Sequence, residues 1–121
     1  MINNNEARKM NHLSVQPKVK TVTENDLDDL VNNNSLAIID CWAPWCGPCR
    51  MLSPIIEELA EELTSNIAFG KLNIDENARI AERFRITAIP TVLFFKNGKR
   101  VDTLIGAVPK STLKEKIQTL T

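Results

Sequence analysis

Net charge is the first property that this 121-residue sequence lacks, because fifteen lysines and arginines balance fifteen acidic residues. A balanced chain has no electrostatic footprint for nucleic acid or for an anionic membrane, which argues against both as partners. Long hydrophobic runs are also missing, since no stretch reaches the roughly 18 apolar residues of a membrane-spanning helix. Residues 1–16 contain no apolar block of signal-peptide length. We therefore expect a cytoplasmic protein.

Cysteine is scarce, with three residues, and histidine occurs once, at His12. Three cysteines are too few, and odd in number, for the disulfide framework of a secreted domain. Cys46 and Cys49 are separated by two residues, a spacing found in zinc sites and in redox pairs alike. A four-cysteine zinc ribbon needs a second such pair, which is absent, and a fourth cysteine that would complete an iron–sulfur run with Cys41 is absent too. Redox chemistry is the favoured interpretation, and metal ligation is the alternative.

The sequence also lacks a nucleotide-binding fingerprint, because it contains neither a G-x-G-x-x-G run nor a P-loop. A cysteine pair that is repeatedly oxidised and reduced here must receive its electrons from another protein by disulfide exchange. We therefore expect no bound cofactor, no metal, and a separate reductase as a partner.

The sequence does contain an alternation of strand-like and helix-like segments after a polar, Asn-rich tail at 1–17. The order β-α-β-α-β-α-β-β-α predicts one α/β domain at 18–121, with a mixed sheet and helices on both faces. Asn97-Gly98 predicts a hairpin between the last two strands, and Thr23 and Ser111 are expected to cap the first and last helices. Strands are expected at 18–22, 36–42, 67–74, 91–95 and 101–105, and helical spacing of apolar residues spans 27–31, 52–63, 80–84 and 113–120.

The close cysteine pair has a chemical consequence if it lies where a loop turns sharply into a helix. Cys46 is then at the helix N-terminus, where unpaired backbone N–H groups and the helix dipole favour negative charge. Such a position lowers a cysteine pKa from about 8.5 into a range of roughly 3.5–7.5 and supplies a thiolate nucleophile. Cys49 lies one turn further in and is expected to stay shielded and more nearly neutral. We predict that Cys46 attacks a target disulfide and that Cys49 resolves the mixed disulfide.

Five segments of the sequence, including the one that contains the cysteine pair, occur in the same order as in a known family. They are 40–51 (Asp-Cys-Trp-Ala-Pro-Trp-Cys-Gly-Pro-Cys-Arg-Met), 71–75 (Lys-Leu-Asn-Ile-Asp), 89–91 (Ile-Pro-Thr), 95–98 (Phe-Lys-Asn-Gly) and 106–109 (Gly-Ala-Val-Pro). Together they resemble the thioredoxin family over roughly residues 19–120. The resemblance implies a thioredoxin fold and a redox disulfide between Cys46 and Cys49. The Gly-Pro pair between the cysteines is typical of thioredoxins rather than of the related isomerases and oxidants.

The same resemblance assigns roles to residues outside the pair. It implies that Asp40 is a buried carboxylate with a raised pKa that relays the proton of Cys49, and that Lys71 tunes its charge. From the residues alone, Asp40 could instead face solvent and Lys71 could be an ordinary surface lysine. The resemblance also implies a cis bond at Ile89-Pro90 and a substrate-binding surface. That surface comprises Trp45, Gly47, Pro48, Ile89, Pro90, Gly106 and Ala107.

The function that follows is general protein-disulfide reduction by a monomer, with a thioredoxin reductase as electron donor and disulfide-containing proteins as targets. An oxidase or isomerase of the same fold, and a binding module without catalysis, are the alternatives. Three departures from the family pattern stand out. Cys41 replaces a common aromatic residue on the face opposite Asp40, Pro44 stands at a position that is often acidic, and Thr87-Ala88 alter the docking surface.

Overall fold

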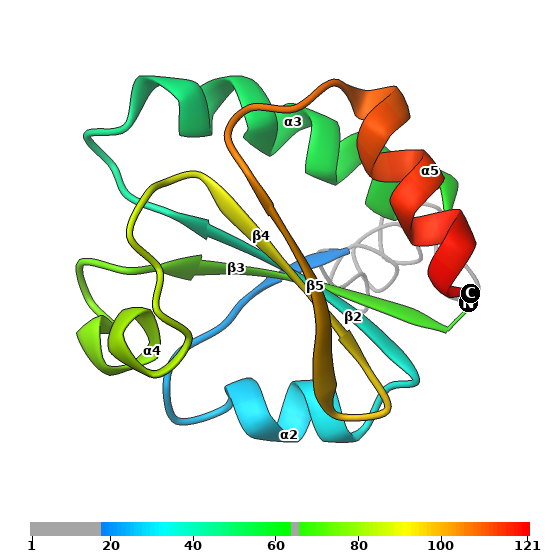
Figure 1. The fold of residues 1–121 in the computed structure, drawn as a ribbon, viewed down its shortest axis with the longest axis horizontal. Helices are drawn as coiled ribbons and strands as arrows, with labels where there is room; N and C mark the ends of the chain where they lie inside the picture. Colours follow the sequence, from blue (N-terminus) through cyan, green and yellow to red (C-terminus); the bar gives the residue numbers. More distant parts are fainter. Residues whose placement is uncertain (1–17, 64–65) are drawn as a thin grey trace, which may run out of the picture.

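The computed structural model describes residues 18–63 and 66–121, so the expected tail at 1–17, with His12, lies outside the described residues. Its elements follow the predicted order and place a mixed five-stranded sheet between two layers of helices (Figure 1). The predicted fold class is therefore confirmed. The elements are β1 (Val19–Thr21), α2 (Leu27–Asn32), β2 (Leu36–Trp42), α3 (Gly47–Glu62), β3 (Ile67–Asn73), α4 (Ala78–Arg83), β4 (Thr91–Lys96), β5 (Lys99–Ile105) and α5 (Lys110–Leu120).

The sheet has the strand order β1-β3-β2-β4-β5, with β2 in the middle. Strands β1, β3 and β2 run parallel, and β4 pairs antiparallel with both β2 and β5. A central strand has helices over both faces, which explains why Leu36–Trp42 is an almost continuous apolar run. The functional segment that follows therefore begins at a rigid, fully paired strand.

Successive side chains of β2 point to opposite faces of the sheet and enter two separate cores. Helices α3 and α5 cover one face, and α2 and α4 cover the other (Figure 1). Ile38 packs in the first core with α3 and α5 residues such as Leu52 and Leu113. Ile39 packs in the second core, which includes Leu27 of α2. The charged residue of the strand, Asp40, therefore faces the α3 side, toward the helix that carries the cysteines.

The β4–β5 hairpin forms at Asn97-Gly98 as predicted. Both residues have positive φ, 52° and 84°, and Lys96 pairs with Lys99 across a two-residue loop. Two turn residues with positive φ match a type I′ turn, whose twist suits the adjoining strands. Glycine adopts such angles at little cost, which explains its place in the turn.

The largest differences from the expected boundaries and caps are at β5, α5 and α2, whereas the expected ends of β1, β3 and β4 differ by one residue. Strand β5 begins at Lys99 instead of 101, because the tight turn brings Lys99 directly opposite Lys96. The Ser111 cap is wrong: Pro109 is the N-cap of α5, its carbonyl accepts from the N–H of Thr112, and Ser111 lies inside the helix. At α2, Thr23 caps a preceding turn, where its N–H donates to the Asp26 carboxylate at 2.6 Å. None of the helices in residues 18–63 and 66–121 is long and apolar enough to cross a membrane.

Candidate active site

The cysteine pair lies where the loop after β2 enters α3. Cys46 is the N-cap of the helix, with extended backbone, and Pro48 occupies the first turn, where its missing N–H costs nothing. The structure contains a Cys46–Cys49 disulfide with the two Cα atoms 5.3 Å apart. The Cys46 sulfur accepts a hydrogen bond from the backbone N–H of Cys49 at 3.2 Å. A donor and a helix N-terminus aimed at this sulfur favour its thiolate form.

Exposure does not distinguish the two cysteines in the disulfide form, because Cys46 is 4% and Cys49 is 3% exposed. Their surroundings do. Cys49 lines a cavity of about 160 Å³ together with Asp40 and Trp42. Cys46 follows Trp45, whose side chain is 68% exposed at the rim. Cys49 therefore adjoins the cavity that contains Asp40, whereas Cys46 follows the exposed rim residue Trp45.

Asp40 is buried beneath the disulfide, with 3% exposure, so a solvent-facing aspartate is the wrong alternative. Its Oδ1 and the Nε1 of Trp42 both lack hydrogen-bond partners among the described residues, and both residues line the cavity. Burial raises the pKa of Asp40 to about 7, against the opposing effect of the Lys71 charge. A carboxyl group that titrates near pH 7 can accept and return a proton under physiological conditions.

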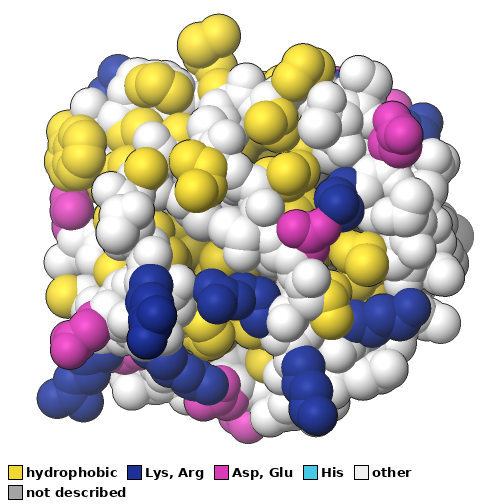
Figure 2. Space-filling view, viewed as in Figure 1, with side chains coloured by type: hydrophobic (Ala, Val, Ile, Leu, Met, Phe, Trp, Pro, Cys, Tyr) yellow, Lys and Arg dark blue, Asp and Glu magenta, His cyan; other side chains and the backbone are white. Residues whose placement is uncertain are grey.

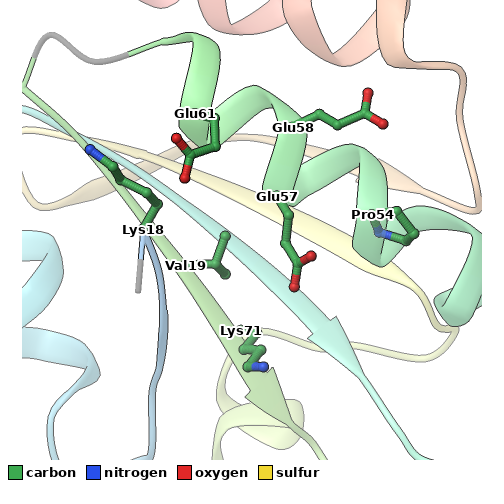
Figure 3. Close-up of a pocket in the computed structure, with 7 residues that line it drawn as sticks. All are labelled: Lys18, Val19, Pro54, Glu57, Glu58, Glu61 and Lys71. Atoms are coloured by element: carbon green, nitrogen blue, oxygen red, sulfur yellow. The ribbon is translucent and has the colours of Figure 1, made fainter. Parts of the chain in front are cut away.

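Lys71 occupies the wall between that cavity and a larger surface hollow. It is the register partner of Asp40 in the β2–β3 pairing and lines the 160 Å³ cavity. It also lines a hollow of about 550 Å³ between α3 and the strands β1 and β3. Figure 3 shows the Glu57 side chain pointing from α3 toward Lys71, whereas Glu58 points away. Lys71 is thus the cross-strand neighbour of Asp40, and its charge lowers the pKa of that carboxyl group against the effect of burial.

An apolar groove of about 330 Å³ is lined in part by Trp45, the residue that precedes Cys46. The indole N–H of Trp45 donates to the Asp75 carboxylate at 3.0 Å, which fixes one edge of this groove. The sequence did not indicate this contact, because the two residues are 30 positions apart. Trp45 and Ile89 line this groove, as expected of the substrate-binding surface, and so do Thr87 and Ala88, which were expected to alter the docking surface. The groove is also lined by Ile74 and Ile86, which the sequence reasoning missed.

The remaining expected surface residues come from loops at the same end of the sheet. The Ile89–Pro90 peptide bond is cis, as the resemblance implied. The N–H of Gly106 donates to the Pro90 carbonyl at 2.8 Å, which holds the loop after β5 against this segment. Gly106 has φ of +96°, an angle that side chains disfavour. Ile105, which precedes it and is 62% exposed, is a further apolar rim residue that the sequence reasoning missed.

Cys41 lies apart from the pair. It is fully buried in the core on the α2 and α4 side, on the opposite face of β2 from Asp40. Burial, aided by the nearby Asp40 charge, raises the pKa of its thiol to about 12. Because Cys49 shares a cavity with Asp40, the sheet separates Cys41 from the disulfide, and the three cysteines do not converge on one point.

Comparisons with known proteins agree on one family. The family model described as Thioredoxin matches residues 18–119. The chain is 52% identical over 102 residues to "Thioredoxin M-type, chloroplastic" of Pisum sativum, covering 84% of this chain and 59% of the pea protein. It is 56% identical over 85 residues to "Thioredoxin" of Pyropia yezoensis, covering 70% of this chain and 79% of the relative.

Solved structures give the same result. A mutant thioredoxin from Halobacterium salinarum NRC-1 superposes with a TM-score of 0.81 at 33% identity, covering 89% of this chain and 96% of that one. Thioredoxin of Plasmodium falciparum superposes with a TM-score of 0.79 at 39% identity, covering 85% and 100%. Fold and sequence similarity therefore extend over nearly all of the described residues.

Proposed function

This chain belongs to the thioredoxin family of thiol–disulfide oxidoreductases, and we propose that it acts as a general protein-disulfide reductase. One observation carries the proposal above the others. The disulfide at the start of α3 has Cys46 as helix cap and hydrogen-bond acceptor, while Cys49 faces a chamber shared with a buried carboxyl group. This arrangement gives the two sulfurs different chemistry within one reversible pair.

In the first step, the reduced protein attacks a target disulfide through the Cys46 thiolate. A bond forms between the Cys46 sulfur and one target sulfur, and the target's own S–S bond breaks. The electron pair of that bond leaves with the second target sulfur as a thiolate. The hydrogen bond that the backbone N–H of Cys49 donates to the Cys46 sulfur stabilises the attacking thiolate, and so does the N-terminus of α3.

In the second step, Cys49 resolves the mixed disulfide. Asp40 accepts the Cys49 proton, and the resulting thiolate attacks the Cys46 sulfur. The bond to the target breaks and its electron pair leaves with the target sulfur as a thiolate, and the two target thiolates take up protons from water to give the dithiol. The cavity is lined mainly by apolar surface, but Asp40, Ser53 and Lys71 also line it, and at about 160 Å³ it is large enough to hold water. The proton can therefore pass between Asp40 and Cys49 through a bridging water molecule. Two electrons have moved to the target, and the Cys46–Cys49 disulfide has formed.

Target binding is assigned to the groove and the loops around the pair. Trp45, Ile89 and Ala107 offer apolar contacts, and Gly47 with Gly106 lets a target backbone approach closely. Pro90 has no N–H, so the neighbouring backbone is available to pair with an extended target strand. Pro48 stiffens the turn that presents Cys46.

Members of the family work with a thioredoxin reductase and with disulfide-containing targets, and we propose the same two kinds of partner for a monomer of this chain. For its location we propose the cytoplasm, in line with the sequence prediction. The chloroplast is the second candidate, because the Pisum sativum and Spinacia oleracea relatives are described as chloroplastic. Imaging of a tagged full-length chain in the source cells would distinguish the two.

Insulin reduction with dithiothreitol, run beside a redox titration of the pair, tests the proposed activity. We expect insulin to precipitate faster with the protein than without it, and the couple to titrate near the roughly −270 mV of thioredoxins. A potential near −120 to −180 mV would favour the oxidase or isomerase alternative. If the Cys46→Ser/Cys49→Ser variant supports the partner's function as well as the natural chain does, the protein is a binding module and the proposal is wrong.

A further inference from the structure

The zero net charge of this chain conceals an uneven distribution. Between Ala78 and Val101 there are six lysines and arginines but one acidic residue, whereas α3 carries four glutamates and one arginine. Figure 2 shows Lys and Arg side chains gathered over the lower half of the face that contains α4 and the β4–β5 turn, with hydrophobic side chains over its upper left. The exposed members of this basic face are Arg79, Arg83, Arg85, Lys96, Lys99 and Arg100.

Two arginines of the basic face pack against the ring of Phe84. The guanidinium carbons of Arg83 and Arg100 lie 4.8 and 5.6 Å from the centre of its ring. The Nη1 of Arg100 also donates to the Phe84 carbonyl at 2.9 Å, which places it against the peptide that leads into Arg85. Arg83 of α4 and Arg100 of β5 are therefore gathered around the turn that continues into Arg85.

The positive charges of the four arginines on this face are only partly compensated by carboxylates. Asp28 of α2 pairs with Arg83 at 2.9 Å. In the part of the chain that the structure describes, Arg79, Arg85 and Arg100 have no such carboxylate partner. Like charges held this close repel one another, and a carboxylate supplied from outside would relieve the repulsion. Guanidinium groups match carboxylates in shape because their planar N–H donors can bind both oxygens.

The basic face approaches the groove at Arg85, whereas its Lys96 and Lys99 lie at the far end of β4, beside the start of β2. Arg85 directly precedes Ile86, which lines the groove, whereas the Asp75 carboxylate already accepts a hydrogen bond from Trp45, another groove residue. A protein segment docked in the groove would therefore extend over the basic face in one direction. We infer that this face is a second docking surface, which selects disulfide-containing proteins whose target cysteine is followed or preceded by acidic residues. The inference rests on the proposed function and names the class of target that the site prefers.

A protein segment fits this surface better than a nucleic acid does. Binding to a nucleic acid draws its affinity from many phosphate contacts, and a chain of zero net charge with an acidic α3 side offers few of them. A short acidic segment needs only the few guanidiniums that follow the groove, beginning with Arg85, which is next to the groove residue Ile86 in the chain. The target disulfide is held in the groove already, so these contacts add to an existing interaction.

The test uses three synthetic disulfide peptides that differ only in the residues flanking the target cysteine, which are Glu, Gln or Lys. The full chain is assayed for kcat/KM with each peptide at low and high salt. We expect the Glu peptide to be reduced roughly 3- to 10-fold faster than the Gln peptide at low salt, and the Lys peptide more slowly than both. The difference should largely disappear at about 0.5 M salt, where charges are screened within a few ångströms.

Arg79→Gln/Arg85→Gln is the diagnostic variant, because neither side chain makes an ion pair or a side-chain hydrogen bond among the described residues. It should lose the preference for the Glu peptide and reduce the Gln peptide as the natural chain does. Lys18→Gln/Lys114→Gln removes the same charge on the α3 side and should keep the preference.

The outcomes separate the two proposals. Equal reduction of all three peptides by the natural chain would overturn the acidic-target inference and leave the reductase activity intact. Failure to reduce any peptide would instead refute the proposed function. Salt-dependent binding of an oligouridine that competes with the Glu peptide, and is lost in Arg79→Gln/Arg85→Gln, would show that the basic face serves nucleic acid.

Discussion

Asp40 and Cys41 are neighbours on β2, and both are buried with a raised pKa, yet their surroundings differ. Asp40 faces α3 and opens into a 160 Å³ cavity that it shares with Cys49. Cys41 faces α2 and α4 and is enclosed by apolar side chains such as Ile39 and Leu72. Burial alone therefore does not make a titratable group useful. A group takes part in the chemistry when its buried position also opens toward the reacting atoms.

The largest expected effect is on the rate of insulin reduction, which should differ between variants of Cys46 and of Cys41. Cys46→Ser should lower insulin reduction to the rate of dithiothreitol alone, because no thiolate remains to attack the target. Cys41→Ala should keep activity within about twofold and cost about 1 kcal/mol of unfolding free energy, since it removes one small buried group. Loss of activity in a well-folded Cys41→Ala variant would contradict the assignment of Cys41 to the core.

The second prediction concerns stability and pH. The raised pKa of Asp40 means that the folded protein binds this proton more tightly than the unfolded chain does, so the group lowers stability as pH rises from 3.8 toward 7. The cost is absent below pH 4 and complete above pH 7, at about 4 kcal/mol. Asp40→Asn should therefore be more stable than the natural chain at pH 8 by up to that amount and nearly equal at pH 4, as measured by denaturant unfolding of the oxidised protein.

Asp102 provides the matched control for that measurement. The hydrogen bond from Lys116 lowers the pKa of Asp102, so its ionised form stabilises the folded state, and this contribution is lost as pH falls. Asp102→Asn should thus reduce stability at neutral pH, opposite in sign to Asp40→Asn. If both variants change stability in the same direction at pH 8, burial does not raise the pKa of Asp40 as described.

The third prediction is kinetic. Asp40→Asn should slow release of the target from the mixed disulfide by about 10²-fold at pH 7, because Cys49 loses its proton acceptor. The initial attack by Cys46 should be nearly unchanged. Rapid acid quenching followed by mass spectrometry separates the two steps. In the natural chain, release should accelerate as pH rises through about 7, where Asp40 ionises. An unchanged mixed-disulfide lifetime in Asp40→Asn would remove Asp40 from the mechanism.

The smallest effect is expected at Lys71, whose charge lowers the pKa of Asp40 against the effect of burial. Lys71→Gln should move the midpoint of the release profile to higher pH while preserving its shape. Lys18→Gln is the control, since Lys18 lines the same outer hollow but not the Asp40 cavity. Equal shifts in the two variants would show that a general change of surface charge, rather than the position of Lys71, sets the midpoint.

The sequence was sufficient to predict the elements whose signals are local. The Asn97-Gly98 turn and the apolar strand around Asp40 depend on neighbouring residues, and both appear in the structure as predicted. The start of α5 was misjudged, because Ser111 is a common cap, whereas the structure uses the carbonyl of Pro109.

Features that depend on packing between distant segments could not be predicted in this way. The Trp45–Asp75 hydrogen bond joins the active-site loop to the turn after β3. The gathering of Arg83 and Arg100 on Phe84 joins α4 to β5. Both contacts arise only when the sheet brings these segments together, since no local spacing connects the residues.

Trapping the mixed disulfide tests the central claim most directly. Oxidised target is mixed with Cys49→Ser and, separately, with Cys46→Ser, and the crosslinked peptides are mapped by mass spectrometry. The account predicts a stable complex linked through Cys46 in Cys49→Ser and little complex in Cys46→Ser. A complex that forms as readily through Cys49 in Cys46→Ser would contradict the division of the pair into an attacking and a resolving cysteine.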